Sequence, residues 1–151
     1  MLLEVSRASD VEATPPVAWS FIRDVARMTA CIPNVSELRT LESDRRYSAL
    51  VNDQLGPFKI SVPVEIELQA VEEPHRISAA VTGADRRGQA RINGTLGAQI
   101  DALESGTRIA LSMRVEVLGK LATLGAAPMR RRADEIFARF AQCVQAELGA
   151  A

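Results

Sequence analysis

Hydrophobic and polar positions alternate with a period of two through the middle of the chain. The clearest run covers residues 58–70, where apolar side chains stand at the even positions and mostly polar ones at the odd positions. This is the pattern of a β-strand with one buried face. Pro63 interrupts the polar side of the run and predicts an edge position or a bulge there. Shorter runs predict further strands over residues 3–13, 35–41, 46–54, 77–81, 90–100 and 109–117.

A helical period follows the first and the last of these strands. Thr14 suits an N-cap and Pro16 the first turn, so the sequence predicts a helix from there to about Met28. A short helical segment is expected up to Ile32. Beyond residue 128 an apolar stripe at helical spacing predicts a long C-terminal helix; its members are Met129, Ala133, Ile136, Phe137, Phe140, Val144 and Leu148.

The order of these elements predicts the fold class. Strands joined by short turns are antiparallel, and one helix after them can cover the apolar face of their sheet. We therefore expect an α+β helix-grip fold: a curved seven-stranded antiparallel sheet around a long C-terminal helix, with one or two short helices after the first strand. Gly88, Gly94 and Gly97 predict strong coiling or close backbone approach near residues 90–100. One domain over residues 1–151 is expected.

Charge and cysteine content narrow the function classes. The formal net charge of −1 argues against a nucleic-acid binder that depends on many phosphate contacts. The N-terminus has no leader pattern, and no stretch approaches the roughly 20 apolar residues of a membrane span, so a cytoplasmic protein is predicted. Cys31 and Cys143 lie outside any CxxC or Cys/His cluster, which predicts free thiols in a reducing compartment. A disulfide between them is the alternative.

Catalytic motifs are missing from the sequence. His75, the one histidine, follows Pro74 in a predicted turn and is expected to be solvated there. The pairs Glu65/Glu67 and Glu72/Glu73 belong to a polar strand face and a turn, so they are not expected to act as acid and base. No nucleophile-elbow, zinc-protease, phosphate-loop or dinucleotide motif occurs. The prediction is a protein that is not an enzyme and holds no metal or resident cofactor.

The apolar residues are mainly aliphatic, with aromatics at 4%. A coiled sheet with such an inner face need not fill its own interior, and apolar pockets between a sheet and a helix bind lipophilic molecules. A fully packed core is the equal alternative. The candidate cavity residues are Phe21, Ile32, Leu50, Phe58, Ile60, Val62, Ile92, Leu96, Leu111, Met113, Met129, Ile136, Phe137 and Phe140.

A basic run, Arg130, Arg131 and Arg132, is the candidate contact with a membrane surface or an acidic partner. The alternative is a solvated helix face.

Several short motifs resemble those of the carbon monoxide dehydrogenase G-subunit family, in the same order along nearly the whole chain. Thr14–Asp24 resembles its "APxxVWxxLxD" opening and Cys31–Val35 its "CIPGV" segment, with Asn34 in place of glycine. The further matches are Leu55–Lys59 with "GPFK", Gly83–Ala90 with a Gly-rich turn and strand, Ser105–Thr107 with "GGT", Gly119–Gly125 with "GKLAxLG" and Ile136–Phe140 with "FFARF".

The resemblance implies a START-like helix-grip protein that serves molybdenum-containing carbon monoxide dehydrogenases and related hydroxylases without catalysing a reaction. Its expected partners are a lipophilic small molecule, with a quinone or lipid as cargo, a molybdenum-containing dehydrogenase complex and, transiently, the inner face of the cell membrane. Nucleic acid is not expected, and a homodimer is left open. The alternatives are a ligand-free assembly or membrane-recruitment factor and a START-like cyclase or hydrolase.

Overall fold

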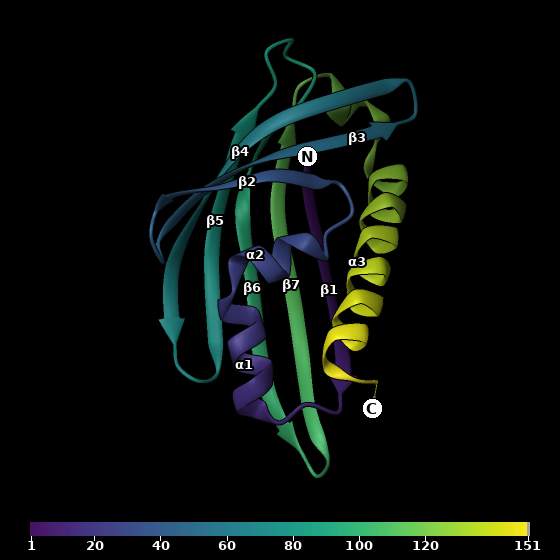
Figure 1. Cartoon of the computed structure of the whole chain (residues 1–151). Helices are drawn as coiled ribbons and strands as arrows, with labels where there is room; N and C mark the ends of the chain where they lie inside the picture. Colours follow the sequence, from purple (N-terminus) through teal and green to yellow (C-terminus); the bar gives the residue numbers. More distant parts are fainter. Residues whose placement is uncertain (151) are drawn as a thin grey trace.

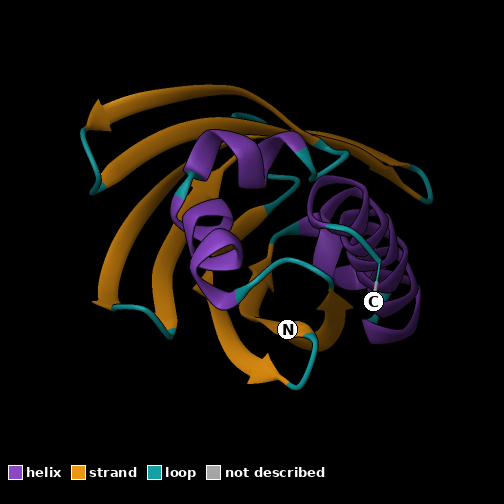
Figure 2. Ribbon diagram, turned by 60° about the horizontal axis from the view of Figure 1, so that its bottom comes forward, coloured by secondary structure: helices purple, strands orange, loops and turns teal. Residues whose placement is uncertain are grey.

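Seven antiparallel strands form one sheet that curls around four helical segments (Figures 1 and 2). The computed structural model describes residues 1–150. The strands are β1 (Leu2–Val11), β2 (Val35–Glu42), β3 (Arg46–Leu55), β4 (Phe58–Glu72), β5 (Arg76–Ala84), β6 (Arg91–Leu103) and β7 (Gly106–Leu118). The helices are α1 (Pro15–Arg23), α2 (Val25–Ala30), the 3-10 helix η1 (Lys120–Leu124) and α3 (Ala126–Leu148).

The sheet order is β1-β7-β6-β5-β4-β3-β2. Strands β2 to β7 follow one another as hairpins, and β1 pairs with β7, so the first and last strands are neighbours. This architecture confirms the predicted helix-grip fold. Figure 2 shows the curl of the sheet and the helices on its concave side, which is where the apolar alternation of residues 58–70 points.

The first helical segment differs from its prediction. The sequence predicted one helix to about Met28, whereas α1 ends at Arg23 and α2 begins at Val25. Asp24 between them has an extended backbone, with φ −89° and ψ 95°, and its Oδ1 accepts a hydrogen bond of 3.1 Å from the backbone N–H of Arg27. An aspartate that caps a new helix competes with helix continuation, which explains the break.

Pro63 and Gly94 lie at places in the sheet that suit their backbone properties. Pairing of β4 with β5 extends from Glu72 only to Val64, so Pro63 lies at a local edge of the sheet. Gly94 in β6 has no room for a side chain, because a Cβ there would collide with the backbone of Arg114 and Val115 in β7. The glycine thus permits the close approach of strands that strong coiling requires.

The core consists of two hydrophobic clusters. The first, which we call the α1 cluster, is Val11, Ala18, Trp19, Phe21, Ile22, Cys31, Ile77, Ala98, Ile100, Ile109, Phe140, Val144 and Leu148. The second, the η1 cluster, is Ala49, Ile60, Val62, Val64, Val81, Ala90, Val115, Val117, Leu121 and Met129. Helices α1 and α2 and the C-terminal half of α3 cover the first, whereas η1 and the start of α3 cover the second.

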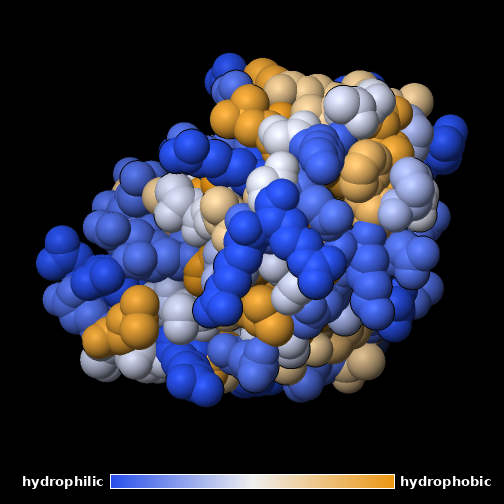
Figure 3. Space-filling model, turned by 90° about the horizontal axis from the view of Figure 1, so that it is seen from above, coloured by the Kyte–Doolittle hydropathy of each residue, from blue (hydrophilic) through white to orange (hydrophobic). Residues whose placement is uncertain are grey.

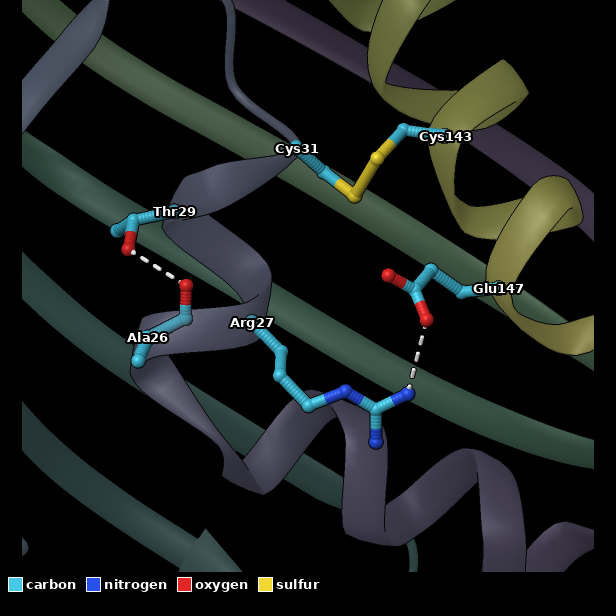
Figure 4. The surroundings of a disulfide bond; sticks show 6 residues. All are labelled: Ala26, Arg27, Thr29, Cys31, Cys143 and Glu147. Atoms are coloured by element: carbon cyan, nitrogen blue, oxygen red, sulfur yellow. Dashed lines mark hydrogen bonds and ion pairs between the residues drawn. A yellow bond between two sulfur atoms is a disulfide. The ribbon is translucent and has the colours of Figure 1, made fainter.

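The cysteines form a disulfide, and the prediction of free thiols was wrong. Cys31, just after α2, is joined to Cys143 of α3 with a Cα–Cα distance of 5.5 Å (Figure 4). An ion pair lies beside it, between Arg27 Nη2 and Glu147 Oε2 at 3.2 Å. The two sulfur atoms meet because the end of α2 and α3 lie side by side, although 112 residues separate them in sequence.

Candidate ligand-binding face

The register of the strands arranges the concave face in rows of apolar side chains. One row crosses five strands through Leu68, Ala79, Leu96, Met113 and Val5, which are paired in this order from β4 to β1. We call these five residues the central row. Every member is apolar because each strand alternates in phase with its neighbours.

The rows on either side are also largely apolar. Towards η1 the next row consists of Ile66, Val81, Gly94, Val115 and Leu3. Towards α1 it consists of Ile77, Ala98 and Leu111 and ends at Arg7 on the edge strand. Because the only charged member stands at the edge, the middle of the concave face offers no group for polar chemistry and suits an apolar molecule.

Most side chains of the two neighbouring rows are more buried than those of the central row. Val81, Val115 and Ile77 are buried at 6–7% exposure, as expected under a helix layer, whereas Ile66 and Leu111 are partly exposed. In the central row only Ala79 is buried, at 8%, whereas the four larger side chains remain partly exposed. The helices therefore leave apolar surface uncovered where the two clusters meet, in the middle of the sheet. Such surface is typical of a place that a ligand covers.

Helix α3 is fixed on both sides of this region. Near its C-terminus, the disulfide at Cys143 and the backbone hydrogen bond from Ala13 to Leu148, 3.0 Å, attach it to the segments around α1 and α2. Near its N-terminus, Arg132 attaches it to β3. Ile136 and Phe137 lie between these attachments and are partly exposed, and neither belongs to a hydrophobic cluster. They add two large apolar side chains that a ligand can contact.

Eleven of the fourteen predicted cavity residues lie in or against the two clusters. Phe21 and Phe140 are buried in the α1 cluster, with Ile32 and Leu111 packed at its margin. Ile60, Val62 and Met129 are buried in the η1 cluster, with Phe58, Ile92, Leu96 and Met113 at its margin. Only Leu96 and Met113 belong to the central row.

Leu50 does not lie on the concave face with the others. Ala49 and Val51 of the same strand pack in or against the η1 cluster, so the side chain between them points to the opposite side of β3. Sequence reasoning also omitted Leu68, Ala79 and Val5 from the candidate residues. Alternation with polar residues predicted that these three lie in strands. Only the register of the strands shows that they share one row.

Arg132 forms an internal ion pair and is not free for a membrane or a partner. Its Nε lies 2.9 Å from Oδ2 of Asp53, whose side chain is only 8% exposed, and its Nη1 lies 3.0 Å from Oε2 of Glu135. The hydrogen bond to Asp53 is the main cause that raises the pKa of Arg132. Arg130 and Arg131 remain exposed on the first turns of α3.

Two open hollows lie elsewhere, and the predicted cavity residues line neither. A groove of about 520 Å³ runs between β1 and α3, with Ala138, Ala141 and Gln142 on its helix side. Across it, Arg108 donates hydrogen bonds to Asp10, at 2.8 and 3.1 Å, and holds the pKa of that carboxyl below its ordinary value. An aspartate held ionised in this way is poorly suited to act as a general acid.

The second hollow, of about 390 Å³, lies at the turn between β4 and β5 and contains exposed His75. Its acidic members are Glu72, paired with Arg76, and Asp101. Over residues 1–150, no three His, Cys, Asp or Glu side chains gather as a metal site requires. No helix in the same range is long and apolar enough to span a membrane.

The curled sheet, the long C-terminal helix and the apolar concave face define a START-like helix-grip protein. A conserved protein from Geobacillus kaustophilus has the same fold, with a TM-score of 0.84 at 20% identity over 96% of this chain and 94% of that one. A START superfamily protein from Mycobacterium smegmatis matches with a TM-score of 0.69 at 14% identity over 96% of both chains.

The family model of the carbon monoxide dehydrogenase G subunit (CoxG) matches residues 8–149, and the chain belongs to this family. The resemblance found in the sequence is thereby confirmed. No curated protein sequence matches the chain.

Proposed function

We propose that this protein is a non-catalytic accessory of a molybdenum hydroxylase or carbon monoxide dehydrogenase system and carries a quinone on its concave face. The observation that carries the proposal is the partly exposed central row, whose large side chains are all apolar. Covering such surface contributes about 25 cal/mol per Å² of apolar area. Membership of the CoxG family supplies the link to the dehydrogenase system.

A quinone also has carbonyl oxygens, which need hydrogen-bond donors when they leave water. Arg23 at the end of α1 has a buried nitrogen, Nη1, without a hydrogen-bond partner among the described residues. Unpaired buried donors are rare and costly, so each one invites a functional explanation. In the proposal Arg23 donates to a quinone oxygen, while the rings and the isoprenoid tail lie against aliphatic side chains.

The carrier takes its quinone from a membrane and delivers it to, or receives it from, the molybdenum enzyme. It works at the cytoplasmic face of the cell membrane as a peripheral protein. An aliphatic face favours this ligand class over a charged metabolite, because charged groups are expensive to bury without partners.

The test is to purify the protein under mild conditions from a lysate that contains membranes and to compare its native with its denatured mass. The expected result is a mass difference equal to one quinone or lipid, and the same molecule in the solvent extract. An empty protein that also fails to bind added quinone would contradict the carrier proposal and favour the ligand-free assembly factor.

A further inference from the structure

One end of the molecule carries a strong net positive charge. Residues 55–59, 84–91 and 118–131 hold seven Lys or Arg residues and one Asp, a formal charge of +6. The whole chain has a formal charge of −1, so the remainder carries −7. A protein close to neutral overall thus has a strongly basic end.

These three segments lie together in space. The backbone N–H of Leu121 donates to the carbonyl of Gln89 at 2.7 Å, which joins η1 to the β5–β6 hairpin. Gly56 of the β3–β4 turn lies against the side chain of Leu124 in η1. Both hairpins and η1 are therefore at the same end of the sheet, at the top of Figure 1. We call this surface the basic end.

The cations of the basic end are exposed and form no ion pairs among the described residues. Its seven cations are Lys59, Arg86, Arg87, Arg91, Lys120, Arg130 and Arg131, and all seven are exposed. Within residues 1–150 none of them has an ion-pair partner, whereas seven of the other eleven Lys and Arg residues do. Like charges that gather without counter-ions repel one another, and an external anionic surface removes that cost.

Apolar residues lie between these cations. Leu118 is 41% exposed, and Pro57, Ala126 and Ala127 are also exposed. In Figure 3, which looks down on this end, hydrophobic and hydrophilic atoms lie side by side. Cations interspersed with aliphatic side chains suit a bilayer, where the cations meet headgroup phosphates and the apolar groups enter the interface. A nucleic acid, whose surface is phosphate and sugar, gives an exposed leucine no such environment.

We propose that the basic end docks on anionic phospholipid headgroups. The inference rests on the proposed carrier function, because the η1 cluster directly below this end is continuous with the concave face where the quinone would bind. Docking in this orientation places the end of the sheet that η1 covers against the membrane that supplies the ligand.

Sedimentation with vesicles of equal parts phosphatidylglycerol and phosphatidylcholine tests the docking. The native protein is expected to bind these vesicles, to bind less as salt rises, and to ignore vesicles of phosphatidylcholine alone. The triple variant Arg87→Gln, Arg130→Gln, Arg131→Gln should lose on the order of a hundredfold in partitioning, since each charge is worth about 1 kcal/mol near an anionic surface.

A matched control removes three exposed cations from other surfaces: Arg7→Gln, Arg39→Gln, Arg139→Gln. Its net charge equals that of the test triple, so its binding should stay within about threefold of the native protein when docking is local. Equal losses in the two triples, equal binding to neutral vesicles, or no vesicle binding by the native protein would each overturn the proposal.

A second pair of variants tests apolar insertion. Leu118→Gln should weaken binding several-fold, and Leu41→Gln, which changes a leucine of 52% exposure on β2, should not. A short DNA duplex is then added as a competitor. If the duplex displaces the protein from the vesicles and Leu118→Gln has no effect on binding, the two results would also count against a bilayer partner.

Quinone binding in the absence of vesicles separates this inference from the proposed function. A short-chain, water-soluble benzoquinone should bind the test triple as tightly as the native protein. Vesicle docking without any quinone binding would reject the carrier function and leave the docking surface standing. Quinone binding without any vesicle docking would reject the docking surface alone.

Discussion

At the scale of single residues, Arg23 stands out because it holds the one buried side-chain polar atom without a hydrogen-bond partner among the described residues. Its Nη1 is buried and makes no hydrogen bond among the described residues. A buried donor without a partner costs roughly 1–3 kcal/mol, more when it is charged. An unpaired buried donor invites a functional explanation, and in a binding site the ligand supplies the missing partner.

Replacing Arg23 should change stability and quinone binding in opposite directions. We expect Arg23→Met to raise the free energy of unfolding by about 1 kcal/mol and to weaken quinone binding by about tenfold, because a charged hydrogen bond is lost. Urea denaturation and a quinone titration measure the two effects. Arg39→Met on β2 is the control and should change neither. A destabilised Arg23→Met protein that still binds quinone normally would show that the arginine is structural.

At the scale of elements, α3 is held against the rest of the molecule by bonds of different kinds. The Cys31–Cys143 disulfide and the Arg27–Glu147 pair connect it to α2 and the residues that follow, and the Arg132–Asp53 pair connects it to β3. The disulfide closes a segment of 112 residues, and long closed segments restrict the unfolded chain most.

Removing the disulfide should therefore destabilise the fold measurably. The double variant Cys31→Ser, Cys143→Ser is expected to lose about 2–4 kcal/mol of unfolding free energy. Dithiothreitol should lower the stability of the native protein by a similar amount and leave that of the double variant unchanged. A native protein that is indifferent to the reductant would show that the bond contributes nothing. Thiol trapping in cells would report whether the bond persists there, since disulfides in reducing compartments are usually transient.

At the scale of the whole molecule, much of the fold could be predicted because local patterns determine it. Alternation over residues 58–70 fixed a strand and its buried face, and the stripe from Met129 to Leu148 fixed the long helix. Local patterns do not indicate which elements pack against one another. The disulfide, the Asp53–Arg132 pair and the basic end all join residues far apart in sequence.

The candidate site was predicted only in part for the same reason. Leu50 and Ala49 differ by one position, and that single step moves a side chain to the other face of β3. Identifying the central row requires the register of five paired strands, and the pattern along a single strand does not contain that information. The kink at Asp24 depends on a cap competing with a helix that the apolar pattern alone would continue.

Binding of a quinone to the concave face is tested most directly by a titration with a short-chain benzoquinone followed by tryptophan fluorescence. Trp19 is the one tryptophan of the chain and belongs to the α1 cluster, so a quinone bound nearby should quench it. Two neighbouring alanines provide a matched pair: Ala79 lies in the central row, and Ala80 points to the opposite face of β5.

We expect saturable quenching in the native protein and in Ala80→Phe. Ala79→Phe should fold, as judged by its circular dichroism, and should bind about tenfold more weakly or worse, because the added ring takes the space of the ligand. Equal binding by Ala79→Phe and the native protein, or no saturable quenching in any of the three, would contradict quinone binding at this face.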